Sequence, residues 1–349
     1  MKYSIIVPVF NRPNEVEELL ESLTTQSLSD FEVLIVEDGS QITCEAVCKR
    51  FAQQLDIKYF MKPNSGPGMS RNYGAERAQG DYLLILDSDV VLPPDYLKAV
   101  DDELKKTSAD AFGGPDRAHE SFTDTQKAIS YSMTSFFTTG GIRGGKKKLD
   151  KFYPRSFNMG IRRDVYETLG GFSKMRFGED IDFSIRIFKA GYSCRLFPKA
   201  WVWHKRRTDF RKFWRQVYNS GIARINLYKK YPDSLKLVHL LPMVFTLGCA
   251  FLAFLFLLGF ILFFVLPAGM PQATGLGLSI LALQPLILYS FLIFADATSK
   301  NNSAKIGILS IAAAFIQLTG YGCGFLEAWW KRCVLGKDIF SAYEKNFYK

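Results

Sequence analysis

Three long apolar stretches near the end of the sequence constrain the fold of this chain most. They cover Leu237–Leu266, Ala273–Ala295 and Ile306–Leu326, and Gln284 and Gln317 are among their few strongly polar interruptions. A bilayer core is about 30 Å thick, so a helix needs about 20 apolar residues to cross it. All three stretches meet this requirement. We therefore predict a membrane domain over residues 237–330 with about three transmembrane helices.

The part of the chain before these stretches alternates charged and apolar residues as soluble proteins do. Its first residues run directly into the strand-like segment Ser4–Val9, which is too short for the apolar core of a signal peptide. The six cysteines form no CxxC pair, and this pattern fits a reducing compartment. We therefore expect the N-terminal domain to be cytoplasmic, at the inner face of the cell membrane.

The net charge of +10 is concentrated just before the first apolar stretch. Ten lysines and arginines lie between Lys205 and Lys236, against two aspartates. A basic segment beside a membrane helix satisfies the positive-inside rule and attracts anionic lipid head groups. Apolar residues recur in it at helical spacing, namely Phe210, Trp214, Val217, Ile225 and Tyr228. The pattern predicts a basic amphipathic helix within residues 208–236 that binds membrane lipids, and it favours this partner over nucleic acid.

The charges between and after the apolar stretches leave the topology open. The uncharged link Pro267–Gln272 suits the outer side of a membrane, whereas Lys300 and Lys305 suit the inner side. Three spans would then place the basic tail, residues 331–349, outside. Either the positive-inside rule is broken here, or one apolar stretch is re-entrant or part of a hairpin.

Strand and helix patterns alternate over the first 110 residues. The predicted strands are Tyr3–Val9, Phe31–Val36, Lys58–Met61 and Tyr82–Leu86. This rhythm predicts a mostly parallel sheet flanked by helices, an α/β domain that we extend over residues 1–207. Such sheets bind ligands beyond the carboxyl ends of their strands. The polar segments at those ends are Asn11–Arg12, Asp38–Ser40 and Asp87–Asp89.

Asp87-Ser88-Asp89 is a candidate metal motif. Two aspartates at positions i and i+2 of a strand end point to the same side. Their oxygens can hold a hard divalent cation such as Mn²⁺ or Mg²⁺, with diphosphate oxygens completing the shell. The alternative is an acidic turn before a helix that begins near Pro93.

Several motifs in this order resemble the family 2 glycosyltransferases of GT-A fold, inverting enzymes that use nucleotide-diphosphate sugars. The resemblance covers about residues 3–225. Its motifs are Ser4–Arg12, Val36–Ser40, Gly66–Gly74, Leu86–Asp89, Gly170–Phe172, Gly178–Asp180 with Arg186, and Val202–His204. Glu37 departs from the family pattern, which more often has aspartate there, whereas Asp38 matches the residue usually placed on the base.

The resemblance implies a donor site with a divalent metal. The residues implied for the nucleotide sugar are Pro8, Phe10, Asn11, Arg12, Asp38, Arg71, Asp87 and Ser88. Asp89 would be the direct metal ligand, with Asp87 and His204 beside it, and the metal would neutralise the leaving diphosphate. Arg71 could instead be a surface arginine, and His204 a structural histidine of its strand.

The resemblance also implies the catalytic residues. In Gly178–Asp182, Asp180 would be the general base that accepts the proton of the attacking hydroxyl, and Glu179 would orient the acceptor. Asp182 could begin a helix or pair with Arg186. The alternative for the cluster is an acidic first helical turn. Asn158 would face the acceptor.

The segment Gly140–Lys148 is rich in glycine and lysine. We consider two interpretations, a linker and a mobile loop that closes over the diphosphate or over a lipid-phosphate acceptor.

The leading functional hypothesis is transfer of a sugar from a nucleotide-diphosphate sugar to a lipid-linked saccharide acceptor, in the synthesis of cell-surface polysaccharide or another glycan. One alternative is a processive polysaccharide synthase, although the chain offers only Trp214-Arg215-Gln216 in place of a QxxRW element. Another is transfer to polyprenyl phosphate itself. A non-enzymatic alternative is a sugar-nucleotide-binding scaffold of a synthesis complex. A transporter is excluded because the apolar stretches carry few polar groups.

Overall fold

The structure is a computed structural model, and it describes residues 2–117, 119, 121–139, 152–175 and 177–337. The predicted loop Gly140–Lys148 and most of the basic tail lie outside these residues. The chain forms two compact units. The first contains Met1–Glu120 and Leu149–Lys205, and the second contains Ser121–Lys148 and Arg206–Phe340. Residues 121–139, which lie within the range predicted for the α/β domain, group with the second unit.

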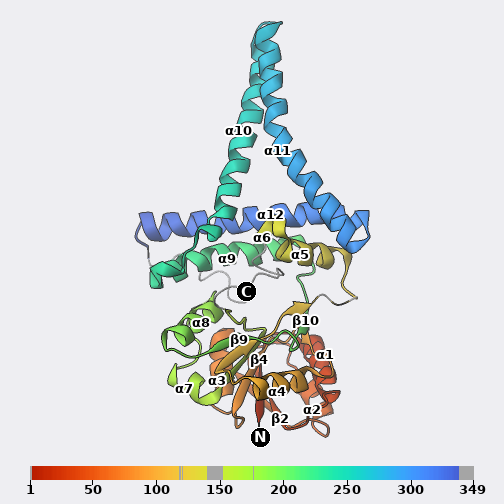
Figure 1. Cartoon of the computed structure of the whole chain (residues 1–349), viewed down its shortest axis with the longest axis vertical. Coiled ribbons are helices and arrows are strands. Elements are labelled where there is room, and N and C mark those ends of the chain that lie inside the picture. Colours follow the sequence, from red (N-terminus) through yellow and green to blue (C-terminus); the bar gives the residue numbers. More distant parts are fainter. Residues whose placement is uncertain (1, 118, 120, 140–151, 176, 338–349) are drawn as a thin grey trace. The chain divides into compact units, whose positions relative to one another are not determined.

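The first unit is built on a sheet flanked by helices (Figure 1). This sheet has seven strands in the order β3-β2-β1-β4-β8-β6-β9. Strands β3, β2, β1 and β4 are parallel, and β8 is antiparallel to both of its neighbours. A smaller sheet has the order β5-β10-β7. The strands are β1 Tyr3–Val9, β2 Phe31–Asp38, β3 Ile57–Lys62, β4 Tyr82–Leu86, β5 Val90–Val91, β6 Ala111–Gly113, β7 Asp116–Arg117, β8 Asn158–Arg162, β9 Cys194–Leu196 and β10 Val202–His204.

Helices cover both faces of the large sheet. Because side chains alternate along a strand, Ile5 and Val7 of β1 face the core formed with α1, whereas Ile6 faces the core that contains Phe183 of α8. The helices of this unit are α1 Pro13–Thr24, α2 Glu45–Phe51, α3 Pro67–Ala75, α4 Tyr96–Lys106, α7 Arg163–Thr168 and α8 Glu179–Lys189. The predicted fold class, a mostly parallel sheet with flanking helices, is confirmed.

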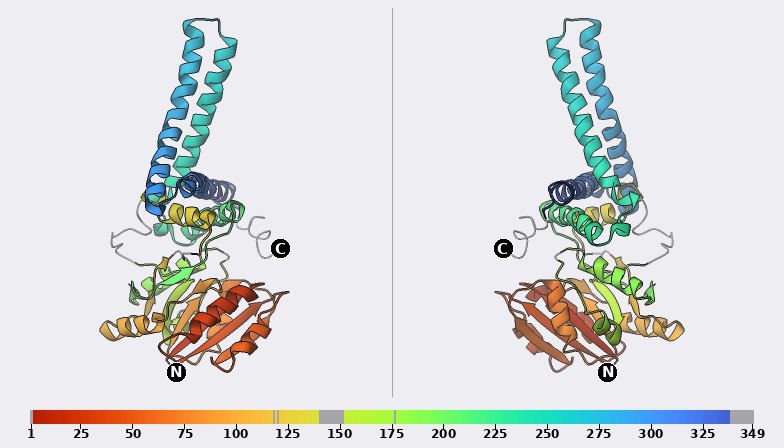
Figure 2. Two further views of the ribbon diagram at one scale, coloured as in Figure 1. Left: turned by 90° about the vertical axis from the view of Figure 1, so that its right-hand side faces the viewer. Right: turned by 90° about the vertical axis from the view of Figure 1, so that its left-hand side faces the viewer.

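The second unit is helical. Its helices are α5 Asp124–Thr134, α6 Phe136–Thr139, α9 Phe210–Lys230, α10 Leu241–Val265, α11 Met270–Asn301 and α12 Ala304–Trp329. Within the described residues, three segments are long and apolar enough to cross a membrane, namely Leu241–Val265, Met270–Asn301 and Ala304–Val334. Helices α10 and α11 form an antiparallel hairpin, and α12 lies alongside α9 (Figures 1 and 2).

Glycines bring α9 and α12 into close contact. A Cβ atom added at Gly324 would lie 2.0 Å from the carbonyl oxygen of Tyr218, and one added at Gly221 would lie 2.1 Å from that of Tyr321. Real Cβ atoms do not approach backbone oxygens this closely, so a larger residue at either glycine must push the helices apart.

We therefore expect Gly324→Leu to lower the thermal unfolding midpoint of the detergent-solubilised protein, because overpacking costs about 1–3 kcal/mol or more. Gly277→Leu in α11 is the matched control, since a Cβ at Gly277 meets nothing within 4 Å. Equal midpoints for the two variants would contradict the close packing of α9 and α12.

Candidate functional site

Three predicted metal ligands meet beyond the carboxyl end of β4. Asp87, Asp89 and His204 each offer a ligand atom, and these atoms all lie within 4.8 Å of one another. His204 reaches the aspartates because it pairs with Val90 of β5, the residue that follows Asp89. Its Nε2 lies 3.3 Å from Oδ1 of Asp89. The small sheet therefore brings a histidine from far along the chain to the Asp-Ser-Asp motif.

The surroundings of His204 fit a metal ligand. Its ring stacks on Phe157 with the ring centroids 4.6 Å apart, which fixes the orientation of the imidazole. Nδ1 is buried and has no hydrogen-bond partner within the described part of the chain. Two carboxylates and one imidazole make a mixed oxygen and nitrogen set, and carboxylates suit Mg²⁺ or Mn²⁺. The three residues could therefore hold a divalent ion.

Arg12 contacts this group directly. Its Nη1 lies 2.5 Å from Oδ2 of Asp89 in an ion pair, so the guanidinium stands next to the carboxylate predicted to be the direct metal ligand. A cation held by Asp89 would have to share this carboxylate with Arg12 or displace it. The predicted contact of Arg12 with the nucleotide sugar stays a prediction.

Arg71 connects the metal group to the predicted catalytic residues. Its side chain is 3% exposed, with Nη2 2.8 Å from Oδ1 of Asp87 and Nη1 3.0 Å from Oε1 of Glu179. The guanidinium also lies over the ring of Phe172, 5.2 Å from its centroid. The surface-arginine alternative is wrong, because this side chain is buried between two carboxylates.

We expect Arg71→Met to destabilise the first unit by about 3–5 kcal/mol, because it leaves Asp87 and Glu179 without their shared cation. Arg77→Met, just beyond the end of α3, is the control, since Arg77 pairs with Glu76, which is 70% exposed. Chemical unfolding of both variants measures the difference. If both variants lost a similar free energy of unfolding, the ion pairs of Arg71 would contribute no more to stability than the exposed pair of Arg77.

The acidic cluster begins α8 after Gly178, whose φ of 83° lies in the left-handed region that glycine tolerates. Asp182 is buried, pairs with Arg186 at 3.1 Å and accepts a hydrogen bond from Ser173. Its role is therefore structural. Asp180 lies 3.5 Å from Nε of Arg155, a neighbour that no sequence pattern indicated.

Burial and the neighbouring Asp180 raise the pKa of Glu179 to about 7, and the ion pair with Arg71 opposes this rise. The carboxyl pKa is 4.5 in an unperturbed glutamate, so the folded chain binds this proton more tightly than the unfolded chain. The resulting stabilisation is fully present below about pH 4.5 and is lost as the pH rises through about 7.

We expect Glu179→Gln to change this pH dependence. The wild-type unfolding midpoint, relative to that of the variant, should be higher at pH 5 than at pH 8. Glu76→Gln is the control, because Glu76 is exposed. A wild-type advantage that is the same at both pH values would show that Glu179 does not titrate in this range.

The predicted nucleobase residue Asp38 is the last residue of β2, and it is buried beside the segment that precedes α3. Its carboxylate accepts hydrogen bonds from the backbone N–H groups of Ser65 and Gly66, both at 2.8 Å, and it pairs with Lys62. Asp38 therefore fixes the segment that precedes α3, the helix that carries Arg71. The departure from the family pattern, Glu37, accepts a hydrogen bond from the N–H of Cys44. Contact of Asp38 with a base stays a prediction.

The end of β1 is tied to the end of β2 by Asn11. Its backbone is left-handed with a φ of 54°, and its side-chain oxygen accepts hydrogen bonds from the N–H groups of Gln41 and Ile42. Pro8 pairs with Val36 of β2, and Phe10 follows directly after β1. Ser88 is buried between the two aspartates. These predicted donor residues therefore stand at the carboxyl ends of neighbouring strands.

Asn158 has structural partners. Its side-chain oxygen accepts a hydrogen bond from the hydroxyl of Tyr96, and its amide donates to the carbonyl of Ala200. The residue is 1% exposed. The predicted acceptor contact would require these bonds to break.

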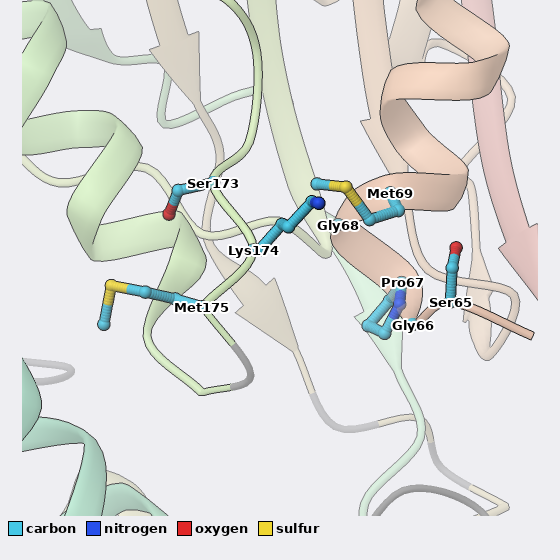
Figure 3. A pocket seen from close by; sticks show the side chains of 8 residues that line it. All are labelled: Ser65, Gly66, Pro67, Gly68, Met69, Ser173, Lys174 and Met175. Carbon is cyan, nitrogen blue, oxygen red and sulfur yellow. The ribbon is translucent and has the colours of Figure 1, made fainter. Parts of the chain in front are cut away.

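A groove of about 250 Å³ opens between the start of α3 and the loop before α8 (Figure 3). Ser65–Met69 line one side, and Ser173–Met175 line the other. The groove adjoins the acidic cluster, because a Cβ at Gly68 would lie 3.7 Å from Cγ of Glu179.

A carboxylate pair and a histidine beyond the parallel strands, linked by one arginine to an acidic helix start, agree with the GT-A class. Residues 4–170 match the family described as "Glycosyl transferase family 2". The chain therefore carries a family 2 glycosyltransferase domain.

The chain is also similar to individual proteins. It is 32% identical over 137 residues to an uncharacterized glycosyltransferase of Rickettsia felis, covering 39% of this chain and 22% of the relative. It is 25% identical over 250 residues to the glycosyltransferase AglE of Haloferax volcanii, covering 70% of this chain and 80% of the relative. The chain spans only 13–22% of the length of the first three curated relatives that it matches.

Among solved structures, the chain is similar to the mannosyltransferase PcManGT of Pyrobaculum calidifontis, described in complex with GDP-Man and Mn²⁺. The TM-score is 0.56 and the identity 16%, over 95% of this chain and 88% of that one. This similarity supports the fold.

Proposed function

We propose that this chain is an inverting glycosyltransferase that moves a sugar from a nucleotide-diphosphate sugar to a lipid-linked saccharide at a membrane. The observation that carries the proposal is the chain of contacts through Arg71. This side chain joins Asp87, beside the metal group, to Glu179, beside the candidate base Asp180. The start of the same helix is fixed by Asp38, at the end of β2. Helix α3 thus links the parts of a donor site that are predicted to hold the nucleobase, the diphosphate and the sugar.

Asp87, Asp89 and His204 would hold the divalent metal, and the bound metal would neutralise charge on the leaving diphosphate. Mn²⁺ is the first ion to test, because the similar mannosyltransferase is described with it. The groove beside Gly66–Met69 is the place we assign to part of the nucleotide sugar. Gly66, which Asp38 holds, lines the groove, and Gly68 brings it close to Glu179.

Asp180 would act as the general base. An acceptor hydroxyl oxygen forms a bond to the anomeric carbon while the bond from that carbon to the diphosphate oxygen breaks. The nucleoside diphosphate leaves with the bonding electron pair, and the hydroxyl proton passes to the Asp180 carboxylate. Because the oxygen attacks the face opposite the leaving group, the anomeric configuration inverts. Glu179 would orient the acceptor hydroxyl.

The acceptor is proposed from the second unit. Its apolar helices are long enough to hold the protein in a bilayer, where a lipid-linked saccharide is concentrated. Helix α9 adds a basic segment that suits anionic head groups, including a lipid diphosphate.

The full chain in lipid nanodiscs, incubated with a panel of nucleotide sugars and Mn²⁺ or Mg²⁺, tests this function. We expect nucleoside diphosphate release from one donor, dependence on the metal, and a faster rate when lipid-linked saccharides are added. NMR of the product should show an inverted anomeric centre. Tight nucleotide binding without transfer to any acceptor in a membrane lipid extract would instead favour the scaffold hypothesis.

A further inference from the structure

Helix α12 packs against α9 in a parallel direction. Contacts advance together along both helices, from Trp214 against Gly320 to Tyr218 against Gly324. Further along, Arg332 beyond α12 donates a hydrogen bond to the side chain of Asn226. The two helices therefore have nearly the same direction, and whatever angle α9 makes with a bilayer, α12 makes too.

Helix α9 is too charged to cross a bilayer. Its 21 residues include six lysines and arginines, distributed from its first turn to its last. Lysine and arginine are strongly disfavoured at the centre of a membrane helix. Its charged side chains and its apolar residues at helical spacing fit the interface between head groups and acyl chains instead.

Among the described residues, the contacts of helix α12 with the α10–α11 hairpin lie in the half of the hairpin next to α9, and they reach up to Tyr289 of α11, whose ring centroid lies 5.6 Å from that of Phe315. The contacts of α12 with α10 fall at Pro242 and Thr246, near the beginning of that helix, beside Gly322. Its contact with α11 beside Gly307 falls at Phe294 and Thr298, near the end of that helix. A helix that ran along the hairpin would also contact its distal half, yet the distal contacts join α10 to α11. Examples are Gly259 with Gly275, and the hydrogen bond from Ser279 to the carbonyl of Phe256.

The hairpin and α12 also differ in burial. In the most apolar segment of each helix, 6% of the residues are buried in α10 and 17% in α11, whereas 44% are buried in the segment that includes α12. An apolar helix that is exposed on nearly all sides suits lipid tails. Helix α12 instead has its own protein partners, because its buried face packs on α9 and on Ala128 and Ile129 of α5.

The two ends of α12 carry groups that suit an interface. At its start, Lys305 pairs with Asp124 of α5 at 2.8 Å. At its end, Trp329 and Trp330 are 44% and 53% exposed. Lys331 pairs with Glu327 at 2.6 Å. Tryptophan and cationic side chains are enriched where a membrane meets water.

We propose that α10 and α11 are the only two spans within the described residues, and that α12 lies with α9 and α5 in one bilayer interface. The partner of this three-helix layer is the anionic head-group region of the membrane. The arrangement also removes the conflict with the positive-inside rule. With two spans, Lys331 and Arg332 lie on the same side as the basic segment before α10. This inference does not rest on the transferase activity.

Single cysteines placed in the full chain, with its six native cysteines replaced, test the topology. We choose Gln53→Cys in the first unit, Ala268→Cys in the α10–α11 link and Lys337→Cys beyond α12. Right-side-out and inverted vesicles are treated with a membrane-impermeant maleimide. We expect Gln53→Cys and Lys337→Cys to be labelled in the same vesicle preparation, and Ala268→Cys in the opposite one.

Every other pattern overturns the proposal. Labelling of Lys337→Cys together with Ala268→Cys, opposite to Gln53→Cys, would show that α12 crosses the membrane. Labelling of all three cysteines from one side would show that α10 and α11 do not cross. Co-purification of each variant with membranes at the wild-type level, after an alkaline carbonate wash, shows that replacing the native cysteines has not prevented insertion.

Discussion

Asp180→Asn should lower the rate of sugar transfer by about 10²–10⁴-fold, the contribution of a positioned general base. The amide has nearly the size of the carboxylate but cannot accept the acceptor proton. The ion pair between Arg71 and Asp87, in the predicted donor site, remains in place. Nucleotide and Mn²⁺ affinities should therefore stay close to those of the wild type, measured by isothermal titration calorimetry.

Asp102→Asn is the control for this substitution, because Asp102 is an exposed carboxylate on α4. It should leave the transfer rate unchanged. If Asp180→Asn transferred sugar at the wild-type rate, Asp180 would not be the base. If it lost nucleotide binding as well, its role would be structural.

Asp89→Asn should weaken Mn²⁺ binding by at least about 10–100-fold. Mutation of a residue that only supports a metal ligand typically has this effect, and Asp89 is predicted to be a ligand itself. Asp89 is the member of the group that contacts both His204 and Arg12. Its removal takes a negative charge from the site and leaves the Arg12 guanidinium to repel an incoming cation. Electron paramagnetic resonance of free Mn²⁺ measures the affinity without requiring turnover.

Asp95→Asn is the matched control, an exposed carboxylate shortly after the motif. It should bind Mn²⁺ as the wild type does. Unchanged Mn²⁺ affinity in Asp89→Asn would place the metal elsewhere, and the assignment of Asp87 and His204 as ligands would then be wrong too.

The sequence was sufficient to predict the sheet and the strand ends. Strands such as Tyr3–Val9 are apolar on both faces, which is typical of a parallel sheet covered by helices on both sides. The turn at Asp87–Asp89 follows such a strand, so its place at the ligand-binding edge could be expected before any coordinates. His204 was found through the family resemblance, since its own strand of three residues carries little signal.

The contacts that organise the site could not be predicted in this way. The Arg12–Asp89 and Arg71–Glu179 pairs join residues 77 and 108 positions apart. No periodicity marks such partners, because they depend on how loops and helices pack after the sheet has formed. The same holds for Arg155 beside Asp180.

Hydropathy also does not distinguish a membrane span from an apolar helix packed at an interface. Helix α12 passes the same test of length and composition as α10. Its difference lies in small residues that allow backbone contact, such as Gly320 and Gly324, which pack on α9. These glycines can be read from the sequence, but the sequence does not show that α9 is the helix against which they pack.

The position of a bound donor in the intact chain tests the account most directly. A crystal structure with Mn²⁺ and an unreactive nucleotide-sugar analogue, with the ion located by its anomalous scattering, would show it. We expect manganese between the carboxylate at position 89 and the imidazole at position 204, and the anomeric carbon facing the carboxylate at position 180. A sugar bound with that carboxylate on its far side, or shut off from it by packed side chains, would contradict the assignment.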